Sequence, residues 1–197
     1  MDILKKGIAG IAVIIFFLSC TGESKKGELV EKDTMYQLKE RGWTSRSMTR
    51  LYEGLSYKAT QVPVPFYLAK QFPEKDLREI DSIYQTVKTE RIVEINFEQE
   101  KGKDLLEETF TRMDYESGVK YMAFEIQKDF KAITQSGDSI RCSGVTFERN
   151  FKLAPYKKVL LYFEGVPEGE SIEILYEDLL FGNGLIRFQF TDPPIAL

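Results

Sequence analysis

The sequence contains no histidine among its 197 residues. Histidine is the commonest general base near neutral pH and the commonest metal ligand, so its absence counts against most acid-base and metal-dependent chemistry. Gly-x-Ser-x-Gly, phosphate-loop, dinucleotide-binding and calcium-loop motifs are missing as well. These absences favour a protein that is not an enzyme and that uses no cofactor and no metal.

An excess of positive charge is also missing. The chain has 27 basic and 31 acidic residues, a formal charge of −4, and charges of both signs are interspersed along most of it. A nucleic-acid-binding protein normally carries a basic stripe or patch and an alkaline pI. We therefore expect no nucleic acid partner.

Long apolar runs are scarce, and the clearest lies at the N-terminus. Gly7 to Leu18 follows the cationic pair Lys5 and Lys6 and leads into Ser19 and Cys20. A membrane-spanning helix is the weaker alternative, because roughly 20 apolar residues are needed to cross the hydrocarbon core. An ordinary secretory signal would need a cleavage site of the Ala-x-Ala type, which is absent here.

The end of this run, Phe17-Leu18-Ser19-Cys20, resembles the lipobox of Gram-negative lipoproteins, with Phe17 where Leu is commoner. The resemblance implies cleavage between Ser19 and Cys20 and a diacylglyceryl group on the Cys20 sulfur. Several acyl chains together anchor a protein durably to a membrane. In this family, Asp directly after the cysteine retains a lipoprotein in the inner membrane, so Thr21 implies an outer-membrane lipoprotein, facing either the periplasm or the cell exterior.

The pattern along the chain predicts an α+β fold that is mostly β. We expect a helical N-terminal part followed by an antiparallel β-sandwich-like domain, with 28–197 forming one folded unit. The expected segments are a signal peptide at 1–19, a polar tether at 20–27, a helical region with an extended proline connector at 28–90, and the β region at 91–197.

Within the N-terminal half, a loose helical pattern covers 28–41. Helical spacing of Met48, Leu51, Tyr52 and Leu55 predicts a second helix. The two prolines of 62–66 predict an extended connector, because each disfavours helix geometry in the residue before it. An apolar face from Leu77 to Val87 predicts a third helix over 74–88.

From residue 91 the apolar period changes to two, which predicts a half-buried strand with Val93, Ile95 and Phe97 on one face. A capping-box spacing of Asp104 and Glu107 predicts a short helix over 104–113. Turn chemistry separates the remaining segments. The further strands are predicted at 119–127, 129–134, 140–151, 157–165, 171–177 and 185–191.

Cysteine is the other scarce residue, with two in the chain. If Cys20 carries lipid, Cys142 has no partner inside the mature chain, and no intramolecular disulfide can form. A reactive thiol is one interpretation of Cys142. A small buried side chain within a strand is the favoured one, because unpaired cysteine is among the most buried residue types.

Two patterns are reminiscent of catalytic sites. Ser117 and Lys120 match Ser-x-x-Lys, but the companion elements of that motif are absent and Gly118 favours a turn followed by a strand. Glu173, Glu177 and Asp178 form an acidic cluster that would suit glycan hydrolysis if two carboxylates faced each other. Alternation along a strand favours a solvated face instead.

The stretch 178–185 stands out from this background. Bulky apolar residues surround a Gly-Asn-Gly turn, which tolerates a positive φ. Leu180, Phe181 and Asn183 are therefore candidate partner-contact residues, although packing beneath the sheet edge is the favoured alternative. We predict a lipid-anchored binding or assembly module for another envelope protein. The alternative is a histidine-independent carboxylate enzyme such as a glycan hydrolase.

Overall fold

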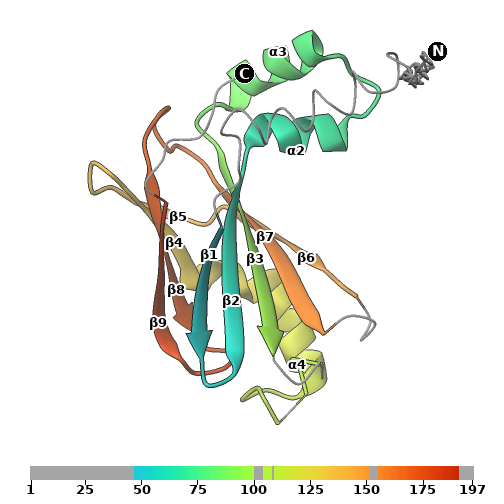
Figure 1. Ribbon diagram of the computed structural model, residues 1–197, viewed down its shortest axis with the longest axis vertical. Coiled ribbons are helices and arrows are strands. Elements are labelled where there is room, and N and C mark those ends of the chain that lie inside the picture. Colours follow the sequence, from blue (N-terminus) through green and yellow to red (C-terminus); the bar gives the residue numbers. More distant parts are fainter. Residues whose placement is uncertain (1–46, 100–103, 108, 151–154, 191–197) are drawn as a thin grey trace, which may run out of the picture.

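The chain folds mostly into β-structure arranged as two antiparallel sheets (Figure 1). The computed structural model describes residues 47–99, 104–107, 109–150 and 155–190. The five-stranded sheet contains, in order, β1 (Ser47–Tyr52), β2 (Leu55–Val62), β3 (Arg91–Gln99), β7 (Tyr156–Phe163) and β6 (Gly144–Glu148). The four-stranded sheet contains β5 (Ser139–Arg141), β4 (Phe130–Thr134), β8 (Ile172–Asp178) and β9 (Gly184–Phe190).

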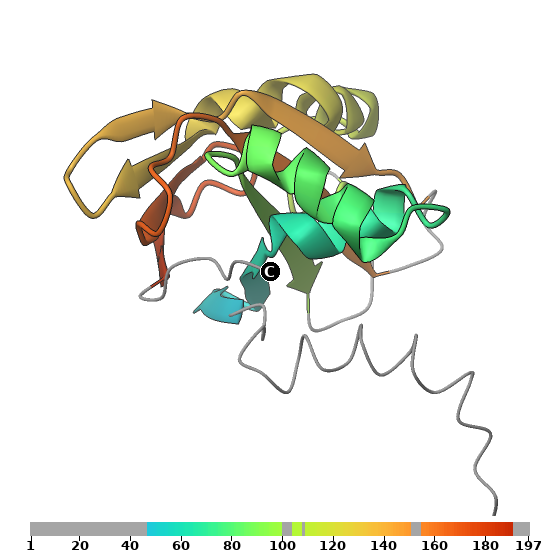
Figure 2. The ribbon, with the colours of Figure 1, turned by 90° about the horizontal axis from the view of Figure 1, so that it is seen from above.

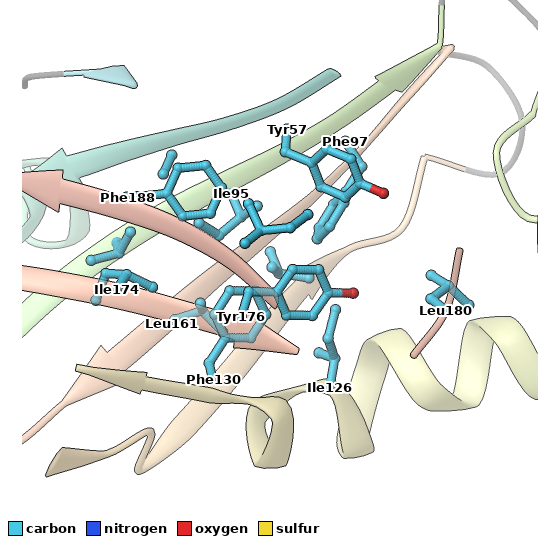
Figure 3. Packing of buried hydrophobic residues seen from close by; sticks show 14 of the residues in the cluster. Tyr57, Ile95, Phe97, Ile126, Phe130, Leu161, Ile174, Tyr176, Leu180 and Phe188 are labelled. Atoms are coloured by element: carbon cyan, nitrogen blue, oxygen red, sulfur yellow. The ribbon is translucent and has the colours of Figure 1, made fainter. Parts of the chain in front are cut away.

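The inner faces of the two sheets share one hydrophobic core. Ile95 and Leu161 of the larger sheet and Ile174 and Phe188 of the smaller sheet are fully buried in the same cluster (Figure 3). Burial of a side chain of this size contributes roughly 1.5–3 kcal/mol, so these alternating positions determine which face of each strand turns inward. The expectation of a mostly β, antiparallel fold is confirmed.

A pair of helices covers one end of the outer face of the larger sheet (Figure 2). These helices are α2 (Val64–Gln71) and α3 (Leu77–Val87). Leu68 of α2 and Ile80 and Tyr84 of α3 are buried in one cluster with Ile92 of β3. The predicted helix over 74–88 is confirmed, and Figure 1 shows the pair at the opposite end of the sheets from the β1–β2 turn.

The helix expected from Met48, Leu51, Tyr52 and Leu55 is wrong. Strands β1 and β2 form a hairpin there, in which Tyr52 pairs with Leu55 and leaves a two-residue loop. Leu51 is exposed, whereas Leu55 is buried. Met48 and Tyr52 lie on one face of β1, and Leu55 begins β2 after a two-residue turn. The turn between the strands gives these residues a spacing that resembles that of a helix. The helical pattern at 28–41 lies outside the described residues.

The proline connector at 62–66 is also corrected, because α2 begins inside it. Pro63 takes the N-cap position and Pro65 lies in the first turn. A proline is well placed in a first turn, where its missing N–H would have no helical partner and its φ already suits a helix. The second proline therefore helps to start the helix that it was expected to prevent.

Two further predictions in the middle of the chain are wrong. The described part of 104–113 forms turns rather than a helix. The strand expected at 119–127 is replaced by α4 (Tyr115–Lys120), a π-helical turn (Tyr121–Glu125) and a 3-10 turn (Ile126–Asp129). Within 119–127 the buried residues are Tyr121, Met122 and Ile126. This spacing suits a helix and not a strand.

The strand expected over 140–151 divides into β5 and β6, which belong to different sheets. Arg141 pairs with Lys131 in the smaller sheet, and Gly144 pairs with Tyr162 in the larger one. Cys142 lies between the two strands, half-buried, and its thiol contacts the Gly144 carbonyl at 3.0 Å. Residues 151 and 191, where two expected strands end, lie outside the described residues.

Candidate binding site at the turn end of the sheets

The sequence-predicted site residues lie in different environments. Leu180 is fully buried, which leaves no surface for a partner, so its role as a partner anchor is corrected in favour of core packing. Phe181 and Asn183 are half-buried. The lipidation and cleavage residues, Cys20 and Ser19, lie outside the described residues.

Asp178, at the end of β8, organises the turn that carries these residues. Its side chain is buried and accepts four hydrogen bonds from the hydroxyls of Tyr57 and Tyr176 and the backbone N–H groups of Phe181 and Asn183. The four donor–acceptor distances lie between 2.7 and 3.1 Å. A buried carboxylate is tolerated when its lone pairs are satisfied in this way. Asp178 is therefore not part of the solvated face expected from the sequence.

The hydrogen bonds around Asp178 also orient the Asn183 amide. Because the Tyr57 hydroxyl donates to Asp178, its oxygen is free to accept, and Asn183 Nδ2 donates to it at 2.6 Å. The amide NH₂ therefore points toward Tyr57, and Oδ1 remains as the second functional atom of the side chain. Asn183 therefore has Oδ1 as an acceptor and its second Nδ2–H as a donor for its remaining surroundings.

The phenols near Asp178 keep their protons at neutral pH. Burial, followed by the hydrogen bond to Asp178, raises the pKa of Tyr57 above its ordinary value. Burial is also the largest cause that raises the pKa of Tyr176, and the neighbouring Tyr121 adds to it. Figure 3 shows the Tyr57 and Tyr176 hydroxyls pointing to the same side of the core. Both groups therefore act as stable hydrogen-bond donors.

A cavity of about 240 Å³, the end cavity, opens beside this turn. It lies where the β1–β2 turn, the end of β3, the segment at 109–110 and the β8–β9 turn meet. The side chains around it combine two aromatic rings, two amides, a hydroxyl and one carboxylate. The end cavity is lined by Glu53, Gly54, Leu55, Gln99, Thr109, Phe110, Phe181 and Asn183.

Glu53 reaches this cavity through an unfavourable backbone conformation. It is a non-glycine residue with positive φ, at 47°, and Gly54 follows at 82°. Positive φ at both central positions is typical of a type I′ hairpin turn, in which Asn or Gly is preferred at the first position. A glutamate there costs about 1 kcal/mol, and strain of this kind concentrates at functional sites.

A buried ion pair holds the segment that carries Thr109 and Phe110. Lys157 Nζ donates to Asp104 Oδ2 at 2.9 Å, and the two side chains are 2% and 5% exposed. Asp104 Oδ1 also accepts the Leu106 N–H at 2.9 Å. The pair links this segment to β7, and removing one partner would leave an uncompensated buried charge. Sequence reasoning did not find it, because the distant Lys157 and Asp104 share no local pattern.

Arg112 stands beside the same turn. A methyl carbon placed on Gly182 would lie 2.7 Å from Arg112 Nη2, so the guanidinium packs directly on the glycine backbone. The Arg112 N–H also donates to the Leu180 carbonyl at 3.2 Å. Gly182, with φ of 84°, is the residue that permits this approach.

A second cavity, of about 220 Å³, lies on the outer face of the larger sheet. Its walls are polar apart from one tyrosine ring, and it holds a single carboxylate. The lining residues are Ser56, Lys58, Asn96, Glu98, Tyr156 and Lys158. Lys158 is already paired with Glu94 and Glu148, at 3.5 and 3.4 Å.

The residues of the two catalytic patterns suggested by the sequence make local structural contacts. Ser117 lies within α4, not in a turn before a strand, and its hydroxyl donates to the N-cap residue Asp114 at 2.6 Å. Lys120 pairs with Glu125 at 3.7 Å and is largely exposed. Glu173 pairs with Arg187 at 3.4 Å on the outer face of the smaller sheet, as expected of a solvated face.

The described part of the chain contains neither a metal-binding cluster nor a membrane-spanning helix. No group of three or more Cys, Asp or Glu side chains in it is arranged to hold a metal ion. Among its helices, none has both the length and the apolar character needed to cross a bilayer.

Burial raises the pKa of the half-buried Cys142 thiol. A thiol that keeps its proton is a weak nucleophile, which favours a structural role for Cys142.

Comparison with known proteins finds a remote likeness among solved structures. No protein-family model and no curated protein matches the chain. Among solved structures, it is similar to the crystal structure of a DUF4426 family protein from Pseudomonas aeruginosa PAO1, with 12% sequence identity and a TM-score of 0.37. The match covers 76% of this chain and 97% of that one. A TM-score this low carries no argument about function.

Proposed function

We propose that the chain is a lipid-anchored lipoprotein of the outer membrane whose sandwich-like β domain is a non-enzymatic binding module. In this proposal Cys20 carries the acyl chains, and the end cavity receives part of another envelope protein. The acyl chains contact the membrane, and the partner protein is recognised at the end of the sheets that carries the β1–β2 and β8–β9 turns.

The end cavity is the observation that carries the binding role. Four separate segments contribute to it, and two of them are held by buried charged groups, Asp178 and the Asp104–Lys157 pair. A binding surface that is ordered before its partner arrives loses little conformational entropy on association. Phe110 and Phe181 supply apolar contact area, and the polar side chains supply orientation.

The alternative, a carboxylate enzyme, requires two carboxylates that face each other across a substrate. Each of the two cavities described above contributes one, Glu53 in the end cavity and Glu98 on the outer face. Asp129 has a pKa raised mainly by burial, but it lines neither cavity and accepts a hydrogen bond from Tyr121 at 2.6 Å. These placements favour the binding module.

Photocrosslinking in intact cells tests the binding role. A benzoylphenylalanine at position 110 should form a covalent adduct with an envelope protein, because Phe110 lines the end cavity. The matched control is the same probe at position 124, since Phe124 is 68% exposed and lies in the π-helical turn. An absence of adducts at position 110, or identical adducts at both positions, would contradict the proposal.

A further inference from the structure

The size of the end cavity limits what it can accept. At about 240 Å³ it has room for about eight water molecules, taking roughly 30 Å³ for each. Sites for drug-sized ligands span roughly 300–1,000 Å³. The end cavity therefore suits one side chain of a partner better than a multi-ring cofactor or an oligosaccharide.

The polar groups of the end cavity favour a hydrogen-bond donor with positive charge. Glu53 is exposed and makes no ion pair or hydrogen bond with any residue in the described part of the chain. Asn183 donates one of its two Nδ2–H groups to Tyr57, so Oδ1 can accept from a ligand and the second N–H can donate to one. The amides of Gln99 and Asn183 and the Thr109 hydroxyl can both donate and accept, so the charge preference comes from Glu53, whose carboxylate attracts a cation and repels a carboxylate or phosphate ligand.

The apolar walls are compatible with the same ligand. Phe110 and Phe181 both line the cavity, and an aromatic face attracts a cation placed over it. A lysine or arginine side chain has an apolar stem for these rings and a charged head for Glu53. The overall charge of the chain, −4, favours approach of a basic partner, and Glu53 is the charged side chain that lines the cavity, although the Arg112 guanidinium packs on Gly182 of the neighbouring turn.

We propose that the end cavity binds the charged head of a lysine or arginine side chain of the partner protein, with Glu53 as its counter-ion and Asn183 Oδ1 as its second acceptor. This inference rests on the binding function proposed above and specifies its ligand. It also explains why a strained glutamate occupies a turn position that Asn or Gly would fill more favourably.

The test uses the full chain purified in detergent micelles, titrated with capped tripeptides and followed by NMR amide shifts. The probes are Gly-Lys-Gly, Gly-Arg-Gly and the uncharged norleucine analogue of the first. We expect the Lys and Arg peptides to shift the amide signals of Gly54, Phe181 and Asn183, and the norleucine peptide to leave them unchanged. Equal shifts with norleucine, or no shifts with any peptide, would overturn the proposal.

Two substitutions of Glu53 separate binding from folding. Glu53→Gln should weaken the Lys peptide about five-fold, because a charge-assisted contact is lost. Glu53→Asn should weaken it equally while raising or preserving Tm, because Asn suits the turn better. The matched control, Glu74→Gln, changes an exposed glutamate at the α2–α3 end and should leave the affinity unchanged. Unchanged affinity in Glu53→Gln would also overturn the proposal.

The outcomes distinguish this inference from the binding function on which it rests. A position-specific crosslink at residue 110 together with no response to the Lys peptide would reject the cationic ligand and leave the binding module standing. A specific response to the Lys peptide that Glu53→Gln weakens as expected, with no crosslink in cells, would support the ligand chemistry and reject the protein partner.

Discussion

At the scale of single residues, Asp178 connects the core with the proposed site. Its carboxylate accepts hydrogen bonds from Tyr57 and Tyr176, which belong to different sheets, and from the backbone of the β8–β9 turn. The same atoms therefore join the sheets and shape the wall that Phe181 and Asn183 form. Any change to this group should alter stability and binding together.

Tyr57→Phe is the mildest change that tests this role. The variant removes one donor to Asp178 and leaves Asn183 Nδ2 without its acceptor, so we expect the free energy of unfolding to fall by about 2 kcal/mol. Tyr67→Phe is the control, since it removes one part-buried bond to Tyr162 and should cost about 0.5–1 kcal/mol. Urea denaturation measures both, and equal losses would count against a special role for Asp178.

At the scale of elements, the segments predicted best are those in which the apolar period and the signals at both ends indicate the same kind of element. Strand β3 and helix α3 combine an apolar period with clear boundaries, and α3 begins at a complete capping box of Asp76 and Glu79. The β1–β2 hairpin was missed because Glu53-Gly54 is an uncommon turn pair, and α4 was missed because Gly118 lies within the helix. Local patterns do not contain the tertiary contacts that decide such segments.

Asp76→Ala tests whether the cap stabilises α3. Asp76 accepts the N–H groups of Arg78 and Glu79, both at 2.9 Å, and its loss should cost about 1 kcal/mol. Asp81→Ala, within the same helix, should stay within about 0.5 kcal/mol of the natural chain. Chemical denaturation measures the change in the free energy of unfolding of each variant. Amide hydrogen exchange in the Asp76 variant should quicken first in α3. Unchanged exchange in the Asp76 variant would show that packing on Ile92 alone holds the helix.

The sequence predicts only part of the candidate site, because only some of its residues belong to a local sequence pattern. The sequence predicts partner contacts around the Gly-Asn-Gly turn, and Phe181 and Asn183, two of the three candidate residues, line the end cavity. Glu53, Gln99 and Phe110 reach that cavity from distant parts of the chain, so no local motif joins them. Leu180 and Phe181 are both bulky apolar residues, but the turn held by Asp178 buries Leu180 in the core and leaves Phe181 half-buried at the cavity.

At the scale of the whole molecule, we expect the proposed lipid anchor at Cys20 to be separable from the β domain. We expect Cys20→Ser to block lipid attachment and signal cleavage, because the acylated sulfur is lost, while the described domain folds as before. Membrane fractionation and mass spectrometry of the N-terminus measure the change, and circular dichroism follows the fold. Cys142→Ser is the natural control and should remain anchored. Recovery of cleaved, acylated Cys20→Ser protein would contradict the lipobox assignment.

The division of 139–148 between the two sheets has a consequence for how the molecule unfolds. One short piece of chain supplies an edge strand to each sheet, β5 to the smaller and β6 to the larger. Detaching it would remove one edge strand from each sheet at once, which couples the loss of one sheet to the loss of the other. The domain should therefore lose its structure in a single cooperative step, with both layers failing together.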